Sequence, residues 1–169
     1  TSALDVMNTT SYATQLNDNH PSFTFQCSCS NAEPETTTNL CYTLLKKGAV
    51  CTIGDGTFFH AGIPPLLNMV HNKGKGTVII MDNRTTAMTG HQDHPGTDTT
   101  LSGGSVPPVD IATVCRAIGV QKVVEVDAFD VKAVDKAIAD CTTQDGLSVI
   151  VSKGDCIFIS RSPKPPYSV

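Results

Sequence analysis

The sequence predicts a three-layer α/β domain with a mainly parallel sheet. Continuous apolar runs of strand length alternate along the chain with amphipathic stretches of helical period, and Gly, Pro or Asp residues separate them. Apolar runs without a two-residue alternation are typical of strands buried on both faces of a parallel sheet. Strands and helices in alternating order favour one domain with helices on both faces of the sheet. A chain of 169 residues is long enough to bury such a core.

The amino-terminal part of the chain carries weaker signals. Residues 1–35 are polar, and we expect an arm of unknown fold in which residues 22–25 form one short strand. Residues 36–47 are expected to form a helix, because its leucines share one side and Gly48 follows two lysines at its end.

The centre of the chain predicts a strand–helix–strand unit. Residues 50–53 and 77–81 are apolar runs that predict two buried strands, and apolar residues recur at helical spacing across 58–71. Two prolines in this helix, Pro64 and Pro65, are tolerated only in its first turn. In a right-handed unit of this kind, the loops that follow both strands lie at the same edge of the sheet.

The remaining residues continue the alternation. Residues 94–108 are rich in Gly, Pro and Thr, and a loop of this length is typical of a lid or a binding segment. We expect helices at 109–118 and 131–141, strands at 122–127, 147–151 and 157–160, and a proline-rich tail or linker at 161–169. The α/β domain should therefore span residues 36–160.

Oxygen-bearing side chains follow each of the two central strands. Gly-Asp-Gly at 54–56 comes directly after the first strand, and Asp82-Asn83 comes after the second. The carboxylate of Asp55, the amide oxygen of Asn83 and a main-chain oxygen near Thr85 are hard ligands of the kind that Mg²⁺ combines with substrate phosphates. Glycines on both sides of Asp55 let a phosphate approach the main chain. Either segment alone is an ordinary turn or loop signal, but together they favour a metal–diphosphate site.

These motifs resemble those of a known protein family. The Gly-Asp-Gly triplet with Asn83 is similar to the thiamine diphosphate motif, in which Gly-Asp-Gly and an Asn hold the Mg²⁺ that binds the cofactor's diphosphate. The usual Asn-Asn pair is Asp82-Asn83 here. The flanking segments, 54–63 and 82–97, resemble the cofactor-binding domain of the large subunit of indolepyruvate ferredoxin oxidoreductase, a 2-oxoacid:ferredoxin oxidoreductase. The resemblance continues more weakly across residues 50–160.

The resemblance implies a thiamine diphosphate-binding fold with thiamine diphosphate and Mg²⁺ as cofactors, and iron–sulfur clusters only in other parts of the complex. It implies oxidative decarboxylation of a 2-oxoacid, an arylpyruvate such as indolepyruvate, with electrons passing to ferredoxin and the acyl group to coenzyme A. In thiamine enzymes a separate pyrimidine-binding domain supplies the activating Glu, and no stretch here resembles that domain. We therefore expect this chain to work in a dimer or hetero-oligomer and to be inactive alone.

Residues beside these motifs are candidates for further roles. His60 and His91 are candidates for catalysis, by orienting a 2-oxoacid carboxylate or moving a proton, or else they line the loop without chemistry. Thr89 and Gly90 either contact the cofactor or shape a turn, and the pattern leaves His94 without an assigned role. The candidate metal ligands are Asp55, Asn83 and Thr85. The candidate cofactor-binding residues are Gly54, Asp55, Gly56, Asn83, Thr85, Thr89 and Gly90.

Composition narrows the function classes. The net charge of −4 and the scattered Lys and Arg residues argue against nucleic acid as a partner, and no apolar run reaches membrane-spanning length. Seven cysteines without a Cys-x-x-Cys pair suggest buried, reduced thiols and a cytoplasmic protein. Two alternatives stay open: a non-oxidative thiamine diphosphate-dependent decarboxylase or synthase subunit, and a non-catalytic remnant that acts as an interaction module.

Overall fold

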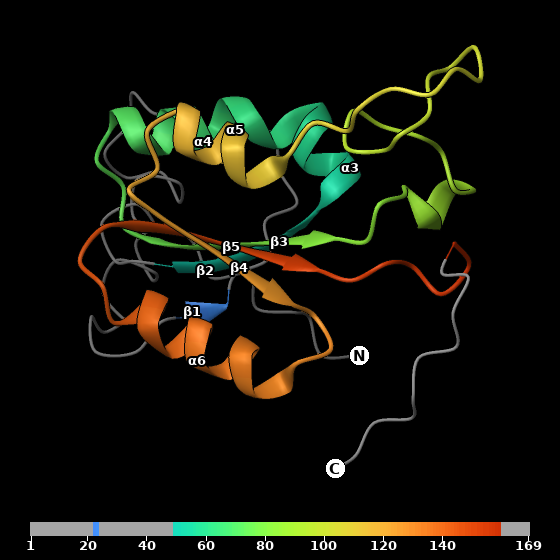
Figure 1. The fold of residues 1–169 in the computed structure, drawn as a ribbon. Helices are drawn as coiled ribbons and strands as arrows, with labels where there is room; N and C mark the ends of the chain where they lie inside the picture. Colours follow the sequence, from blue (N-terminus) through green and yellow to red (C-terminus); the bar gives the residue numbers. More distant parts are fainter. Residues whose placement is uncertain (1–21, 24–48, 160–169) are drawn as a thin grey trace, which may run out of the picture.

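The computed structural model describes residues 22–23 and 49–159 of the chain. The described residues form one parallel sheet of five strands in the order β1-β2-β3-β5-β4 (Figure 1). The strands are β1 (Ser22–Phe23), β2 (Ala49–Gly54), β3 (Gly76–Asp82), β4 (Lys122–Asp127) and β5 (Leu147–Lys153). The predicted parallel α/β sheet is therefore confirmed.

Helices cover both faces of this sheet and complete three layers. Figure 1 shows α3, α4 and α5 over one face and α6 over the other. The helical segments are α3 (Asp55–Thr57), the π-helical η2 (Phe58–Gly62), α4 (Ile63–His71), the 3₁₀ turn η3 (Ala87–Thr89), α5 (Ile111–Ala117) and α6 (Val131–Thr142). Within residues 22–23 and 49–159, no helix combines the length and apolarity needed to cross a membrane.

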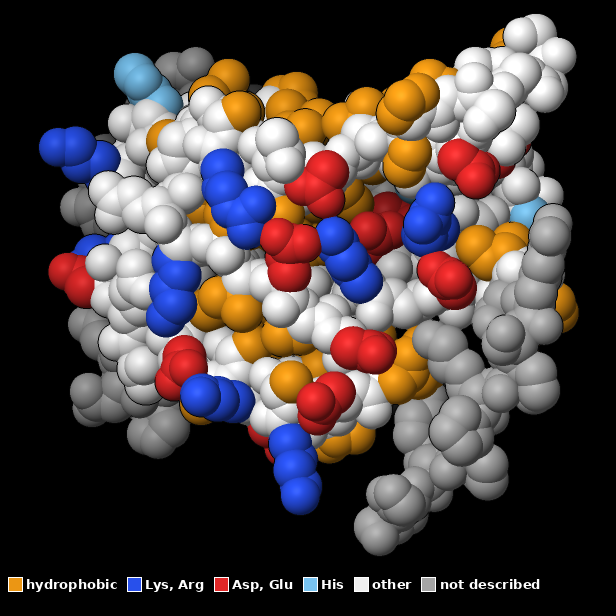
Figure 2. Space-filling view, viewed as in Figure 1, with side chains coloured by type: hydrophobic (Ala, Val, Ile, Leu, Met, Phe, Trp, Pro, Cys, Tyr) orange, Lys and Arg blue, Asp and Glu red, His pale blue; other side chains and the backbone are white. Residues whose placement is uncertain are grey.

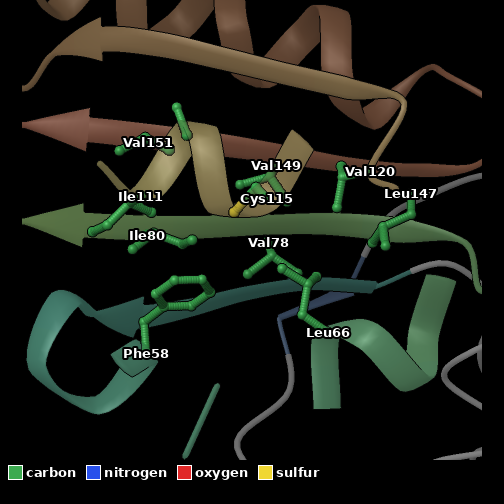
Figure 3. Close-up of a cluster of buried hydrophobic side chains, with 11 residues drawn as sticks. Phe58, Leu66, Val78, Ile80, Ile111, Cys115, Val120, Leu147, Val149 and Val151 are labelled. Carbon is green, nitrogen blue, oxygen red and sulfur yellow. The ribbon is translucent and has the colours of Figure 1, made fainter. Parts of the chain in front are cut away.

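The sheet separates two hydrophobic clusters because successive strand residues point to opposite faces. On the α6 face, Ile150 packs with Ala137 and Cys141. The larger cluster lies under α4 and α5 (Figure 3) and contains Phe58, Leu66, Val78, Ile80, Ile111, Ala112, Cys115, Val120, Leu147, Val149 and Val151. Burial on both faces explains why the central strands read as continuous apolar runs.

The cysteines partly follow the expectation of buried thiols. Cys115 and Cys141 are buried in helices, and burial raises the pKa of the Cys115 thiol to about 11. Cys51 of β2 is exposed instead. The amino-terminal cysteines lie outside the described residues.

The first helical region begins earlier than the sequence predicts. Helical structure starts at Asp55, directly after β2, rather than at Phe58. The prolines lie in the first turn of α4, as expected. Before them, the main-chain N–H of Ile63 donates to the carbonyl oxygen of Phe58 five residues back, which makes a wide π turn. A wider turn relieves the crowding between a proline ring and the carbonyl of the preceding turn.

The sequence predicts a strand at 157–160, and this prediction is wrong for residues 157–159, which the structure describes. Residues 157–159 form a turn, with Ile157 81% and Phe158 79% exposed. After β5 the chain instead crosses the end of β3, where Gly154 N–H donates to the carbonyl of Asp82 and Cys156 N–H donates to that of Asn83. These bonds divert the chain from the sheet, so its apolar residues are not buried there.

The other described elements confirm the predictions within a few residues. The strands at 122–127 and 147–151 and the helix at 131–141 are present. The helix predicted at 109–118 is α5. It begins after Asp110 because the Asp110 carboxylate caps the helix, accepting the N–H of Thr113 at 2.7 Å. The predicted helix at 36–47, most of the polar arm and the tail at 161–169 lie outside the described residues.

Charged side chains join the start of α5 to the ends of β4 and β5. Lys153 Nζ lies 2.7 Å from a carboxylate oxygen of Glu125 and 3.2 Å from one of Asp110. Arg116 lies 2.8 Å from the other oxygen of Glu125. Hydrogen bonds from Lys153 and then Arg116 hold the pKa of Glu125 below its usual value.

Replacing Glu125 with Gln should remove part of the pH dependence of folding stability. Ionised Glu125 stabilises the wild type fully above its ordinary pKa of 4.5, and this contribution is lost as pH falls through the lowered folded-state pKa. The difference should be small because these side chains are partly exposed. Urea unfolding across this pH range measures it, with Asp135→Asn on α6 as the control. A pH-independent difference between wild type and Glu125→Gln would contradict the assignment.

Candidate functional site

The carboxyl ends of β2 and β3 meet, as the strand–helix–strand unit predicts. Gly54 pairs in register with Met81, so the loops that follow the two strands leave the sheet side by side. The N–H of Arg84 donates to Oδ2 of Asp55 at 2.7 Å, across 29 residues of sequence. The structure therefore brings Asp55 and the loop that contains Asn83 together.

The Asp55 carboxylate is the centre of this junction. The residue is 3% exposed, and its Oδ1 accepts the N–H of Gly56 at 2.7 Å. Its Oδ2 accepts the N–H of Arg84 and lies 3.2 Å from Nε2 of His94. Arg84 has φ 61°, a left-handed conformation that is uncommon outside glycine and that costs free energy. The contact with Asp55 helps to hold that conformation.

In each of the three predicted metal ligands, the candidate ligand oxygen already accepts one main-chain N–H. Asp55 Oδ1 accepts from Gly56, Asn83 Oδ1 accepts from Thr85 at 3.2 Å, and the carbonyl of Thr85 accepts from Ala87 at 3.0 Å. Each of these oxygens has a second lone pair for another partner. Hydrogen bonds to ligand oxygens fix their direction, so this set suits a hard cation such as Mg²⁺.

The charge at this edge also favours a cation. The pKa of Asp82 is raised, mainly by burial and secondly by the negative charge of Asp55. Among the described residues, no three His, Cys, Asp or Glu side chains gather as a metal cluster. A cation here would therefore need the amide and main-chain oxygens of Asn83 and Thr85.

The glycines of the triplet have different surroundings. A Cβ on Gly56 would collide with Oγ1 of Thr86, so this glycine lets the two loops pack together. A Cβ on Gly54 would meet no atom within 4 Å, and the backbone there is extended with φ −76°. Protein packing explains Gly56, whereas Gly54 leaves open space above the strand end that an anionic ligand can approach.

His94 is the residue that the sequence analysis missed. Its side chain is 5% exposed and its ring stacks on Phe59 with 5.5 Å between centroids. Its Nδ1 accepts the N–H of Gly96 at 3.1 Å. The only sequence signal is a His-Pro-Gly turn inside a loop without periodicity, and such a turn does not indicate that the ring folds back onto Asp55.

The other sequence candidates lie at the surface. His60 is exposed in η2, and His91 is exposed with its ring 5.1 Å from that of Phe158. The hydroxyl of Thr89 donates to the side chain of Gln92, and Gly90 has φ 116°. These contacts fit the turn-shaping alternative for Thr89 and Gly90, and the catalytic roles of both histidines stay predictions.

An open hollow lies beside this junction. It has a volume of about 430 Å³ at the carboxyl ends of β4 and β5 and is lined by Glu125, Val126, Asp127, Lys153, Gly154 and Asp155. Figure 2 shows acidic and basic side chains interspersed across this face of the molecule. Gly154 joins the hollow to β3 through its hydrogen bond to Asp82.

Comparisons with known proteins point to one family. The family model "Thiamine pyrophosphate enzyme, C-terminal TPP binding domain" matches residues 39–152. The chain is 42% identical over 111 residues to the indolepyruvate oxidoreductase subunit IorA of Methanothermobacter thermautotrophicus, which covers 66% of this chain and 18% of that protein. It is 37% identical over 131 residues to IorA of Archaeoglobus fulgidus, which covers 78% of this chain and 21% of that protein. The chain thus spans about a fifth of these relatives.

A solved structure shares the fold. The 2-oxoglutarate:ferredoxin oxidoreductase from Magnetococcus marinus superposes with a TM-score of 0.60 at 21% sequence identity. The match covers 69% of this chain and 43% of that chain.

Gly56→Ala should destabilise the fold, whereas Gly54→Ala should not. The new methyl group at 56 would collide with Thr86, and overpacking of this kind costs roughly 1–3 kcal/mol. At 54 the methyl group meets open space and an extended backbone, so the free energy of unfolding should stay equal or rise by roughly 0.4–1 kcal/mol. Urea unfolding of both variants measures the difference. Equal destabilisation by both would show that the space above Gly54 is not open.

Proposed function

This chain belongs to the family of thiamine pyrophosphate enzyme C-terminal TPP-binding domains, and on that premise we propose that it binds thiamine diphosphate through Mg²⁺ at the ends of β2 and β3. The observation that carries the proposal is the hydrogen bond from Arg84 N–H to Asp55, which joins the two loops that bear the candidate ligands. The family resemblance alone does not specify this contact.

The residues present fit the cofactor. Asp55 Oδ1, Asn83 Oδ1 and the carbonyl of Thr85 would hold Mg²⁺, because each has a lone pair beyond its main-chain hydrogen bond. The diphosphate would lie over the open space at Gly54, next to the start of the helical segment at Asp55. Main-chain N–H groups at a helix start favour an anion. When bound, thiamine diphosphate supplies the carbon nucleophile for decarboxylation of a 2-oxoacid.

The chain's own groups would bind and orient rather than carry out the carbon chemistry. The turn between Thr86 and Gln92, which contains Thr89 and Gly90, is closed by a main-chain bridge, and we propose that it contacts the bound cofactor. His60 and His91 are exposed and therefore accessible to a 2-oxoacid carboxylate. We keep both as candidates for orienting the substrate or moving a proton.

The whole enzyme would be larger than this chain. Since the chain spans about a fifth of its indolepyruvate oxidoreductase relatives, other parts would supply the pyrimidine-binding domain and its activating Glu. We propose a 2-oxoacid:ferredoxin oxidoreductase that acts on an arylpyruvate such as indolepyruvate, in a dimer or hetero-oligomer. Ferredoxin, coenzyme A and iron–sulfur clusters would belong to that full enzyme. The names of the relatives support the reaction class, and the shared fold of the Magnetococcus enzyme is compatible with it.

Thiamine diphosphate should bind the wild-type chain in the presence of Mg²⁺, and Asp55→Asn should weaken binding by more than about 100-fold. The variant keeps the side-chain volume but removes the charge that would bind the cation, and loss of even an outer-shell partner of a metal costs about 10–100-fold. Isothermal titration calorimetry measures the affinity, and a chelator should abolish binding by the wild type.

Asp145→Asn is the matched control for this titration. Asp145 is an exposed carboxylate that pairs with Lys75 near the opposite ends of the strands, so its loss should leave affinity unchanged. Absence of Mg²⁺-dependent binding by the wild type would contradict the proposal and favour a non-catalytic remnant. Equal affinity of wild type and Asp55→Asn would contradict the assigned ligand.

A further inference from the structure

The Nε2 atom of His94 is a buried polar atom that lacks a well-aligned hydrogen-bond partner among the described residues. It lies 3.2 Å from Oδ2 of Asp55, close enough for an ionic contact, and the side chain is 5% exposed. A buried polar group in this state costs free energy unless its surroundings complete the hydrogen bond. Because Nε2 lies beside the proposed metal ligand Asp55, a hydrogen bond between them would affect how that carboxylate is oriented.

The hydrogen bond on the other ring nitrogen indicates where the proton lies. Nδ1 accepts the main-chain N–H of Gly96, so this nitrogen is unprotonated. In a neutral imidazole the proton is then on Nε2, which makes Nε2 a donor. The donor is 3.2 Å from Asp55 Oδ2, so only a small rotation of the carboxylate is needed to align them.

The two oxygens of Asp55 then have unequal capacity for a metal ion. Oδ2 has the Arg84 N–H and the His94 Nε2–H as neighbours, and once the Nε2–H is aligned these two donors would use both of its lone pairs. Oδ1 accepts only the N–H of Gly56 among the described residues. A divalent cation that approaches this carboxylate is therefore directed to Oδ1.

We propose that His94 is a positioning residue that orients the Asp55 carboxylate so that Oδ1 alone binds the divalent cation. This inference rests on the proposed function of the site. A small rotation of the carboxylate that aligns Oδ2 with the Nε2–H would also fix the direction of Oδ1, so cation binding and the His94 hydrogen bond would support each other. His94 itself does not contact the cation.

The surroundings of His94 are built to keep its ring in place. The ring stacks on Phe59, with 29° between the ring planes. A Cβ on Gly96 would lie 2.7 Å from Phe59 and 3.0 Å from His94, so a side chain at 96 would displace one of these rings. Gly96 thus allows the close packing and also donates the hydrogen bond that sets the tautomer.

Three variants of the full chain test the proposal by calorimetric titration with thiamine diphosphate at a series of Mg²⁺ concentrations. His94→Phe keeps an aromatic ring against Phe59 but loses the N–H donor. Its Mg²⁺-dependent affinity for thiamine diphosphate should be about 10–100-fold weaker than that of the wild type. His94→Gln keeps a side-chain N–H donor and should bind more tightly than His94→Phe. His71→Phe, an exposed change at the end of α4, is the matched control and should bind like the wild type.

A second measurement reads the tautomer in the cofactor-free chain. Nitrogen-15 NMR of the histidine side chains should show the His94 proton on Nε2 and not on Nδ1. This readout does not depend on cofactor binding, and a proton on Nδ1 would leave Nε2 without the donor that the proposal requires.

The outcomes separate this inference from the function on which it rests. If the wild type binds the cofactor and His94→Phe binds it equally well, the inference is overturned but the proposed function stands. A proton on Nδ1 has the same consequence. An affinity of His94→Gln that is no higher than that of His94→Phe also overturns the inference. Absence of binding by the wild type overturns the proposed function and the inference with it. Weakened binding in His94→Phe, partial recovery in His94→Gln and an Nε2 proton together support it.

Discussion

The buried carboxylate of Asp55 is the group on which the arrangement of this edge of the sheet depends. A buried carboxylate is unfavourable unless it is hydrogen-bonded, and here the donors come from different parts of the chain. Gly56 supplies one from the helix start, and Arg84 supplies the other from the loop after β3. Removing the carboxylate would leave both main-chain donors unpaired, at a cost of about 1–3 kcal/mol for each. The same hydrogen bonds therefore stabilise the junction and orient the two oxygens of the Asp55 carboxylate.

The loop after β3 is held from its other side as well. The chain beyond β5 donates main-chain N–H groups to the carbonyls of Asp82 and Asn83, through Gly154 and Cys156. Asn83 is thus fixed between the helix start that follows β2 and the segment that follows β5. This is the reason why apolar residues at 157–159 remain at the surface instead of forming a further strand. A fixed position of this kind would suit the proposed role of the Asn83 amide as a metal ligand, since Mg²⁺ requires near-octahedral geometry.

The sequence was sufficient for the sheet and for the meeting of the loops after β2 and β3, but insufficient for the contacts between those loops. Buried parallel strands produce long apolar runs, so the strands at 50–53, 77–81, 122–127 and 147–151 could be predicted. The apolar run at 157–160 has the same composition, and only the tertiary hydrogen bonds of residues 154–156 exclude it from the sheet. His94 could not be found, because its loop has no periodicity and its contact with Asp55 spans many residues. Pattern reasoning favoured the exposed His60 and His91 because they lie next to the motifs in sequence.

Membership in the thiamine pyrophosphate enzyme family and the geometry at the ends of β2 and β3 support one account: two loops present preoriented oxygens to a single Mg²⁺ that binds a diphosphate. A crystal structure of the chain grown with Mg²⁺ and thiamine diphosphate tests this most directly. The account predicts one cation about 2.1 Å from Asp55 Oδ1, Asn83 Oδ1 and the carbonyl of Thr85, with the diphosphate above Gly54. A cation and cofactor bound at another edge of the sheet, without contact to Asp55 or Asn83, would contradict it.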